Sequence, residues 1–261
     1  MTKVLVVVAD THINSTVGLI RPLITLDDGG EYRASKGQKW LASCFSDFID
    51  HIPEGDMILI LNGDIGEGDI NRRSKQMISR NKATITRMMF DTLEPLINRA
   101  EKIFVVRGTA AHVGQSASIE EEFASDIGAE RCPETKAYSF WQLTLNIDGV
   151  RFDVAHHANM GRLPWTAANA LNALATRTAL LYRNPPDVVI RSHNHRFAET
   201  GESYATRVVY TPAWQLGTEY MSRLGGFEPA DIGGIYFVVT DGQYQMIVKR
   251  YKPANGKEIK V

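Results

Sequence analysis

The sequence has little that would tie it to a membrane, an oxidising compartment or a polyanion. Its 261 residues include two cysteines, Cys44 and Cys132, which match no zinc or redox spacing and favour a reducing cytoplasm. No apolar run approaches the roughly 18 residues that span a bilayer, and the N-terminus has no signal-peptide pattern. The formal net charge of −1 gives no global attraction to nucleic acid. No repeat or linker divides the chain, so we expect one domain over residues 1–261.

What the sequence does contain is a series of short apolar runs separated by helical patterns. The run at residues 4–9 predicts a strand buried on both faces, as in parallel sheets. Two similar runs follow, and helical periodicity predicts the helices between them. The predicted strands are 57–61 and 103–106, and the predicted helices are 35–52, 70–100 and 118–129, the last with a capping box of Ser118 and Glu121. Alternating strands and helices indicate a parallel sheet with helical crossovers.

The pattern changes after residue 135, where strands follow one another more directly. Asp148-Gly149 is a hairpin signal between predicted strands at 139–147 and 150–155. The later predicted elements are a helix at 165–183, strands at 187–191, 208–210, 235–239 and 244–251, and a glycine-rich loop at 214–234. We therefore predict an α/β fold in which two mixed sheets pack face to face with helices outside.

Aspartate or histidine stands at the ends of five predicted strands. These residues are Asp10, His12, Asp64, His112, His156, His157, His193 and His195. One histidine alone is more often a satisfied core or surface residue, but here six of the seven histidines lie at such strand ends. Parallel sheets bind ligands at the carboxyl ends of their strands. Two aspartates and several histidines without a cysteine cluster point to a two-metal hydrolytic centre rather than structural zinc.

In their order along the chain, these motifs resemble those of the calcineurin-like metallophosphoesterase superfamily. The matching motifs are Asp10-Thr11-His12, Gly63-Asp64, His156 or His157, and Ser192-His193-Asn194-His195. The resemblance implies a four-layer αββα fold and two divalent ions, Mn most readily, with Fe, Zn, Ni, Co or Mg as alternatives. It also implies one ion held by Asp10, His12, Asp64 and His195, and a second held by Asp64, His156 and His193, with His156 preferred to His157.

The third motif departs from the family pattern. Gly-Asn-His is expected, but the chain has Gly108-Thr109-Ala110, with His112 two residues further on. In one interpretation His112 is the catalytic acid or a ligand on a variant loop. In the other, Ala110 or Ala111 replaces a former polar residue and His112 is a bystander. Glycines at 108 and 114 would let the loop bend His112 toward the metals, which favours the first interpretation.

The resemblance implies hydrolysis of a phosphoester by a water that two metal ions activate. We predict Asp64 and His112 as the catalytic residues. We expect a phosphodiester rather than a monoester, with nucleic acid among the candidates. The reason is a basic flank on the predicted helix 70–100, where Arg73, Arg80 and Arg87 are spaced by seven. Asn159, Arg162 and Arg73 are the candidate substrate contacts, although each could be an ordinary surface residue. The alternatives are a non-catalytic metal-binding module and a metal-dependent hydrolase of other esters or amides.

Overall fold

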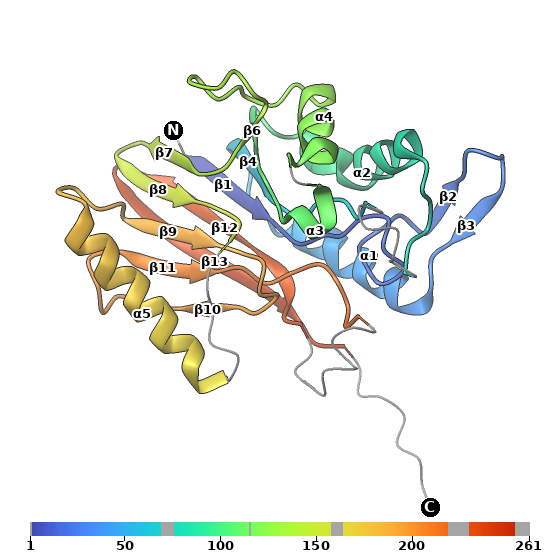
Figure 1. The fold of residues 1–261 in the computed structure, drawn as a ribbon. Helices are drawn as coiled ribbons and strands as arrows, with labels where there is room; N and C mark the ends of the chain where they lie inside the picture. Colours follow the sequence, from blue (N-terminus) through green and yellow to red (C-terminus); the bar gives the residue numbers. More distant parts are fainter. Residues whose placement is uncertain (1, 69–75, 115, 158–163, 219–229, 254–261) are drawn as a thin grey trace, which may run out of the picture.

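Two mixed β-sheets form the centre of the computed structural model, which describes residues 2–68, 76–114, 116–157, 164–218 and 230–253 (Figure 1). The first sheet has the strand order β13-β12-β1-β4-β5-β6, and the second has the order β10-β11-β9-β8-β7. The strands of the first sheet are β1 (Lys3–Val8), β4 (Asp56–Asn62), β5 (Lys102–Val106), β6 (Ser139–Phe140), β12 (Ile232–Thr240) and β13 (Gln243–Tyr251). Those of the second are β7 (Leu143–Ile147), β8 (Val150–Val154), β9 (Val188–Arg191), β10 (Ala198–Glu199) and β11 (Arg207–Tyr210).

The two sheets pack face to face because β1 is apolar on both of its faces. Leu5 and Val7 join a buried cluster with Phe152 and Ile190 of the second sheet. The intervening valines of β1 face the other way, into a cluster with helical residues such as Phe48. This alternation is the period of a strand buried on both sides.

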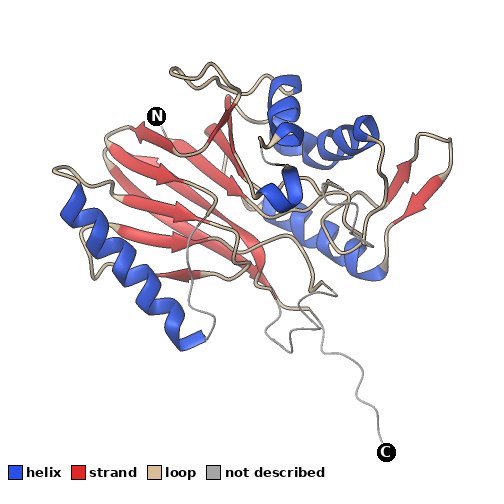
Figure 2. Cartoon of the chain, viewed as in Figure 1, coloured by secondary structure: helices blue, strands red, loops and turns tan. Residues whose placement is uncertain are grey.

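Helices cover both outer faces of the paired sheets (Figure 2). The first sheet is covered by α1 (Lys36–Asp50), α2 (Lys82–Ile97) and α4 (Ser118–Asp126), and the second by α5 (Pro164–Leu181). The remaining elements are α3 (Ala110–Val113) and a hairpin of β2 (Leu23–Thr25) and β3 (Glu31–Arg33). The predicted four-layer αββα arrangement is therefore confirmed. Within the described residues, no helix has the length and hydropathy needed to cross a membrane.

The helix predicted over 70–100 was wrong over residues 76–81, while residues 70–75 lie outside the described part of the chain. Helix α2 begins at Lys82, and Asn81 caps it by accepting a hydrogen bond from the backbone N–H of Thr84. Just before it, the buried Asn14 side chain bonds both the N–H and the carbonyl of Ser79. Those bonds occupy backbone groups that a helix would need. Arg80 therefore lies before the helix, so of the described members of the predicted basic flank only Arg87 is on α2.

Two other local predictions were also wrong. The strand expected over 139–147 is two strands, because β6 pairs with β5 of the first sheet and β7 pairs with β8 of the second. The chain crosses between the sheets at Trp141 and Gln142. The capping box is absent: Ala117 is the N-cap of α4, and Glu121 instead accepts a hydrogen bond from the N–H of Tyr138.

Candidate metal centre

The six predicted metal ligands lie at the carboxyl ends of four strands, where the edges of the two sheets meet. Asp10 and His12 follow β1, Asp64 follows β4, His156 follows β8, and His193 and His195 follow β9. The structure brings them into two groups, Asp10–His12–His195 and Asp64–His156–His193, and within each group the ligand atoms lie within 4.8 Å of one another.

Five of these six residues have a left-handed backbone, which side chains other than glycine rarely adopt. Their φ angles are 52° for Asp10, 42° for His12, 51° for Asp64, 73° for His193 and 54° for His195. Such conformations cost about 1–3 kcal/mol each and concentrate at functional sites. Gly108 supports this geometry, since a Cβ there would lie 2.3 Å from both the backbone N and Oδ1 of Asp64.

The first group has the spacing of ligands around one ion. His195 Nε2 lies 3.2 Å from His12 Nε2 and 3.3 Å from Asp10 Oδ1. Two atoms that bind one ion at about 2.0–2.1 Å in tetrahedral geometry stand roughly 3.3 Å apart. Among the described residues, Asp10 Oδ1 is buried and, apart from this ion-pair contact with His195, accepts no hydrogen bond. A buried carboxylate oxygen without a donor is costly, and a cation would satisfy it.

The second group is centred on Asp64. His156 Nε2 lies 3.0 Å from Asp64 Oδ2, and His193 Nδ1 lies 3.8 Å from the same oxygen. The Nδ1–H of His156 donates to the carbonyl of Asn62 at 2.6 Å, which leaves Nε2 free to bind an ion. His157, by contrast, is largely exposed, and its ring centroid lies 5.0 Å from that of His193. The structure therefore favours His156 as the ligand.

Thr109 occupies the place where the family pattern has asparagine. Its backbone N–H donates to Asp64 Oδ1 at 2.6 Å, and its hydroxyl lies 3.1 Å and 3.0 Å from the two carboxylate oxygens. These bonds fix the orientation of Asp64. Ala110 and Ala111, which follow, are exposed.

Glu67 is a component of the centre that sequence reasoning missed. Its carboxylate accepts the Nδ1–H of His12 at 2.9 Å and that of His112 at 2.9–3.0 Å. The available signal was a carboxylate three residues after Asp64. His12, Glu67 and His112 also form a third group of potential ligands. However, His12 Nε2 faces the first group, which leaves the Nδ1–H of His12 to donate to Glu67. We therefore interpret this third group as a chain of hydrogen bonds, His12–Glu67–His112, rather than as a metal site.

His112 lies within the centre, as its loop position predicted. Its ring stands edge-on to that of His12, with centroids 4.5 Å apart. Burial alone would lower the pKa of His112, but the hydrogen bond to Glu67 and the nearby Asp64 and Asp10 raise it above its ordinary value. His112 is therefore suited to carry a proton near neutral pH.

The electrostatics of the two groups favour a cation. Burial opposes the charged form of His156, yet the carboxylates of Asp64 and Asp10 raise its pKa to about 10. Burial also opposes ionisation of Asp64, but His156 and its neighbours hold the Asp64 pKa well below its ordinary value. Three buried carboxylates, those of Asp10, Asp64 and Glu67, create the negative potential that divalent ions would neutralise.

Glu120 lies behind the loops that carry these groups. Its fully buried carboxylate accepts the N–H of Ile65 at 3.0 Å and the N–H of Gly108 at 2.6 Å. It thereby joins the loop after β4 to the loop after β5. Burial, followed by the charge of Asp64, raises the pKa of Glu120 to about 7.

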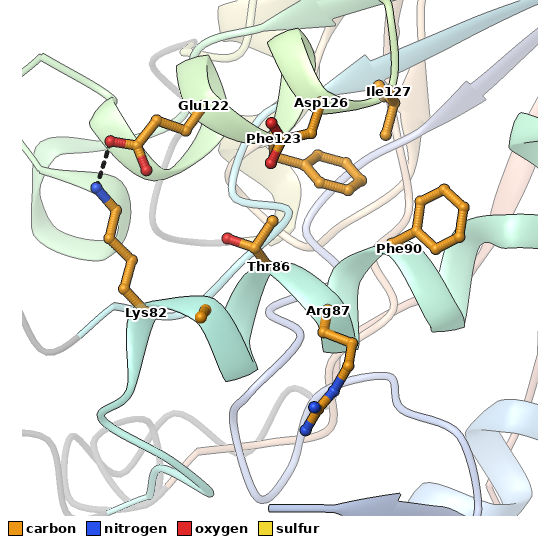
Figure 3. A pocket seen from close by; sticks show the side chains of 9 residues that line it. Lys82, Thr86, Arg87, Phe90, Glu122, Phe123, Asp126 and Ile127 are labelled. Carbon is orange, nitrogen blue, oxygen red and sulfur yellow. Dashed lines mark hydrogen bonds and ion pairs between the residues drawn. The ribbon is translucent and has the colours of Figure 1, made fainter. Parts of the chain in front are cut away.

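The predicted substrate contacts are not part of the described centre. Arg73, Asn159 and Arg162 lie outside the described residues. Arg87 lies on α2, where it donates to the carbonyl of Thr25. It also lines a cavity of about 680 Å³ between α2 and α4, which Figure 3 shows with the Lys82–Glu122 ion pair at its side.

No protein-family model matches the sequence, and no curated protein matches it. Several solved structures are similar in shape at low identity. Vacuolar Protein Sorting 29 from Cryptosporidium parvum has a TM-score of 0.47 and 11% identity, over 97% of this chain and 99% of that one. A dimetal phosphatase from Danio rerio has a TM-score of 0.45 and 9% identity, over 95% of each chain. A metallophosphoesterase from Sphaerobacter thermophilus has a TM-score of 0.43 and 11% identity, over 95% of this chain and 88% of that one.

Proposed function

We propose that this protein is a metal-dependent phosphoester hydrolase that works with two divalent ions, Mn²⁺ most readily. The observation that carries the proposal is the pair of ligand groups at one sheet edge. They adjoin each other, since His156 Nε2 of the second group lies 3.9 Å from Asp10 Oδ1 of the first. Ions of Fe, Zn, Ni, Co or Mg could replace Mn²⁺, because Asp/His sites accept several divalent metals. We place the protein in the cytoplasm, since both of its cysteines are free thiols.

The residues divide into two sets around a shared carboxylate. Asp10, His12 and His195 would hold the first ion, His156 and His193 the second, and Asp64 would contact both. Bound there, the ions would neutralise charge on the phosphoryl group and lower the pKa of a coordinated water to about 7. Glu67 and the carbonyl of Asn62 orient the imidazoles of His12 and His156, as partners of metal-binding histidines commonly do.

His112 would supply the proton for the leaving group. Glu67 accepts its Nδ1–H, so the proton on Nε2 of the charged ring is the one available for transfer. In hydrolysis, a water oxygen forms a new bond to phosphorus while the bond to the leaving oxygen breaks. That oxygen takes the Nε2 proton, and solvent afterwards reprotonates His112. General acid catalysis of this kind contributes about 10²–10⁴-fold to the rate.

We favour a phosphodiester as the substrate. Among the described residues, two arginines next to the site loops are engaged in ion pairs: Arg107 lies 3.5 Å from Glu121, and Arg191 lies 3.1 Å from Asp153. A diester carries less negative charge than a monoester dianion, so its binding needs fewer unpaired cationic side chains. An acid such as His112 is most useful when the leaving group is a poor one, as the alkoxide of a natural diester is.

A three-substrate assay tests the proposal. Protein loaded with Mn²⁺ is given bis-p-nitrophenyl phosphate, p-nitrophenyl phosphate and p-nitrophenyl acetate, and Asp64→Ala is measured in parallel. We expect turnover of the diester above that of the monoester, little turnover of the acetate, and loss of all activity in the variant. Turnover of the acetate alone would favour an esterase instead. Metal binding without turnover of any substrate would favour a non-catalytic metal-binding module.

A further inference from the structure

An exposed tryptophan lies at the same sheet edge as the metal centre. The register aligns Asn62, Val106 and Phe140 across β4, β5 and β6, so Gly63, Arg107 and Trp141 follow in the next row. Adjacent strands are about 4.8 Å apart, which puts the backbone of Trp141 about 10 Å from that of Gly63, beside Asp64. A nucleotide can bridge this span.

Arg107 forms the support for this tryptophan. Its guanidinium carbon lies 4.9 Å from the centroid of the Trp141 ring, in a cation–π arrangement. Arg107 is itself fixed, because its Nε donates to Ser139 Oγ at 2.8 Å and its guanidinium pairs with Glu121. Trp141 nevertheless remains 60% exposed. An exposed aromatic ring held in this way offers a flat apolar face on which a planar group can stack.

We propose that Trp141, supported by Arg107, is a stacking platform for a nucleobase of a nucleotide or single-stranded nucleic acid whose phosphodiester lies at the metal centre. This inference rests on the proposed function for the cleavage step, although the binding step can be measured independently. Aromatic side chains stack on bases irrespective of sequence, and a neighbouring arginine strengthens such stacks.

The surroundings of Trp141 favour a base over an apolar protein partner. Its neighbours are Arg107 and the exposed Gln142, and the latter donates to Asp153 at 2.8 Å. A single ring in polar surroundings offers one flat face, whereas a protein partner needs a contiguous apolar patch. The end of α5 provides a contrast, since Leu180, Leu181 and Tyr182 are exposed there in succession.

A pair of substrates with the same leaving group isolates the contribution of the nucleoside. Thymidine 5′-(p-nitrophenyl phosphate) carries a base, and methyl p-nitrophenyl phosphate does not. We expect Trp141→Ala to raise KM for the thymidine ester about 5- to 150-fold, the range of one lost base stack. Its kcat, and the kinetics of the methyl ester, should not change. Trp141→Phe should restore most of the loss, and Tyr182→Ala, an exposed aromatic at the far end of α5, should have no effect.

Binding without turnover supplies the second measurement. A phosphorothioate-linked tetrathymidylate is titrated into the Mn²⁺-loaded protein, and intrinsic fluorescence is followed. We expect quenching in the parent that is absent from Trp141→Phe, and weaker binding by Trp141→Ala in competition with a labelled oligonucleotide. If no phosphoester is hydrolysed but these differences appear, the proposed function fails and the platform stands. If Trp141→Ala keeps the parental KM and affinity, with an unchanged melting temperature, the platform is wrong.

Discussion

The two halves of the metal centre differ in how many protein ligands each can offer. In the proposed assignment the first pocket has four: Asp10, His12 and His195, which the structure brings together, and the shared Asp64. The second has three, from His156, His193 and the same Asp64. Beside the second pocket stands Thr109, whose N–H and hydroxyl hold Asp64.

The comparison shows two ways in which a protein can position a metal ion: by supplying more ligands, or by holding each ligand in place through a hydrogen bond. In the first pocket the support, Glu67, lies behind a ligand. In the second, Thr109 supports the carboxylate of Asp64 itself. We therefore expect the first ion to bind more tightly than the second, and the second site to depend more on its supports.

The largest effect should come from the residue that both pockets share. Asp64→Ala removes a ligand from each, and we expect activity to fall by at least about 10³-fold, the equivalent of several kcal/mol of metal stabilisation. Elemental analysis after dialysis should find fewer than two ions per chain. Asp153→Asn, at a buried aspartate outside both pockets, is the control and should keep both ions. An Asp64→Ala protein that retained two ions would show that the pockets do not share this ligand.

The next effect concerns the proton donor beside the first pocket. His112→Ala should lower kcat by about 10²–10⁴-fold for an alkyl phosphodiester, and by much less for a p-nitrophenyl ester that needs no proton. Both ions should remain bound. Glu67→Gln should shift the pH profile of kcat toward lower pH, because His112 loses the carboxylate that raises its pKa. Loss of one ion from His112→Ala would instead make His112 a ligand.

The second pocket should be the more sensitive to loss of its support. Thr109→Val removes the hydroxyl but keeps the backbone N–H bond to Asp64. We expect the affinity of the weaker ion to fall about 10–100-fold, as is usual when a partner behind a metal ligand is lost. Calorimetric titration with Mn²⁺ would resolve the two binding events. Thr109→Ser should bind like the parent, and equal weakening of both ions in Thr109→Val would remove the distinction between the pockets.

The smallest effect should come from Glu120, which joins the loops behind the centre. Its pKa is raised from 4.5 to about 7, so its contribution to stability is full below about pH 4.5 and is lost as pH rises through 7. Glu120→Gln cannot ionise. The metal-free parent should therefore lose stability relative to this variant between pH 5 and 8, on the order of 1–3 kcal/mol. Thermal melts at several pH values would show this difference in stability. Mn²⁺ should reduce the difference, because it offsets the charge of Asp64.

The convergence of the six predicted ligands could be foreseen from sequence because strand ends converge. Each of the six follows a short apolar run, and parallel neighbours place such ends at one edge. Glu67 could not be found this way, since it lies in a loop and its partners come from two other segments. Trp141 was hidden inside a predicted strand, because only tertiary pairing separates β6 from β7. The basic flank failed for a similar reason, since the side chain of the distant Asn14 keeps residues before Lys82 out of the helix.

The most direct test of the two-pocket account is anomalous diffraction from crystals grown with Mn²⁺. The account predicts two peaks about 3.5–4 Å apart. One should lie among Asp10, His12 and His195, and the other between His156 and His193, with Asp64 in contact with both and the weaker peak in the second pocket. A single peak at saturating Mn²⁺, or a peak bound by Glu67 and His112, would contradict it.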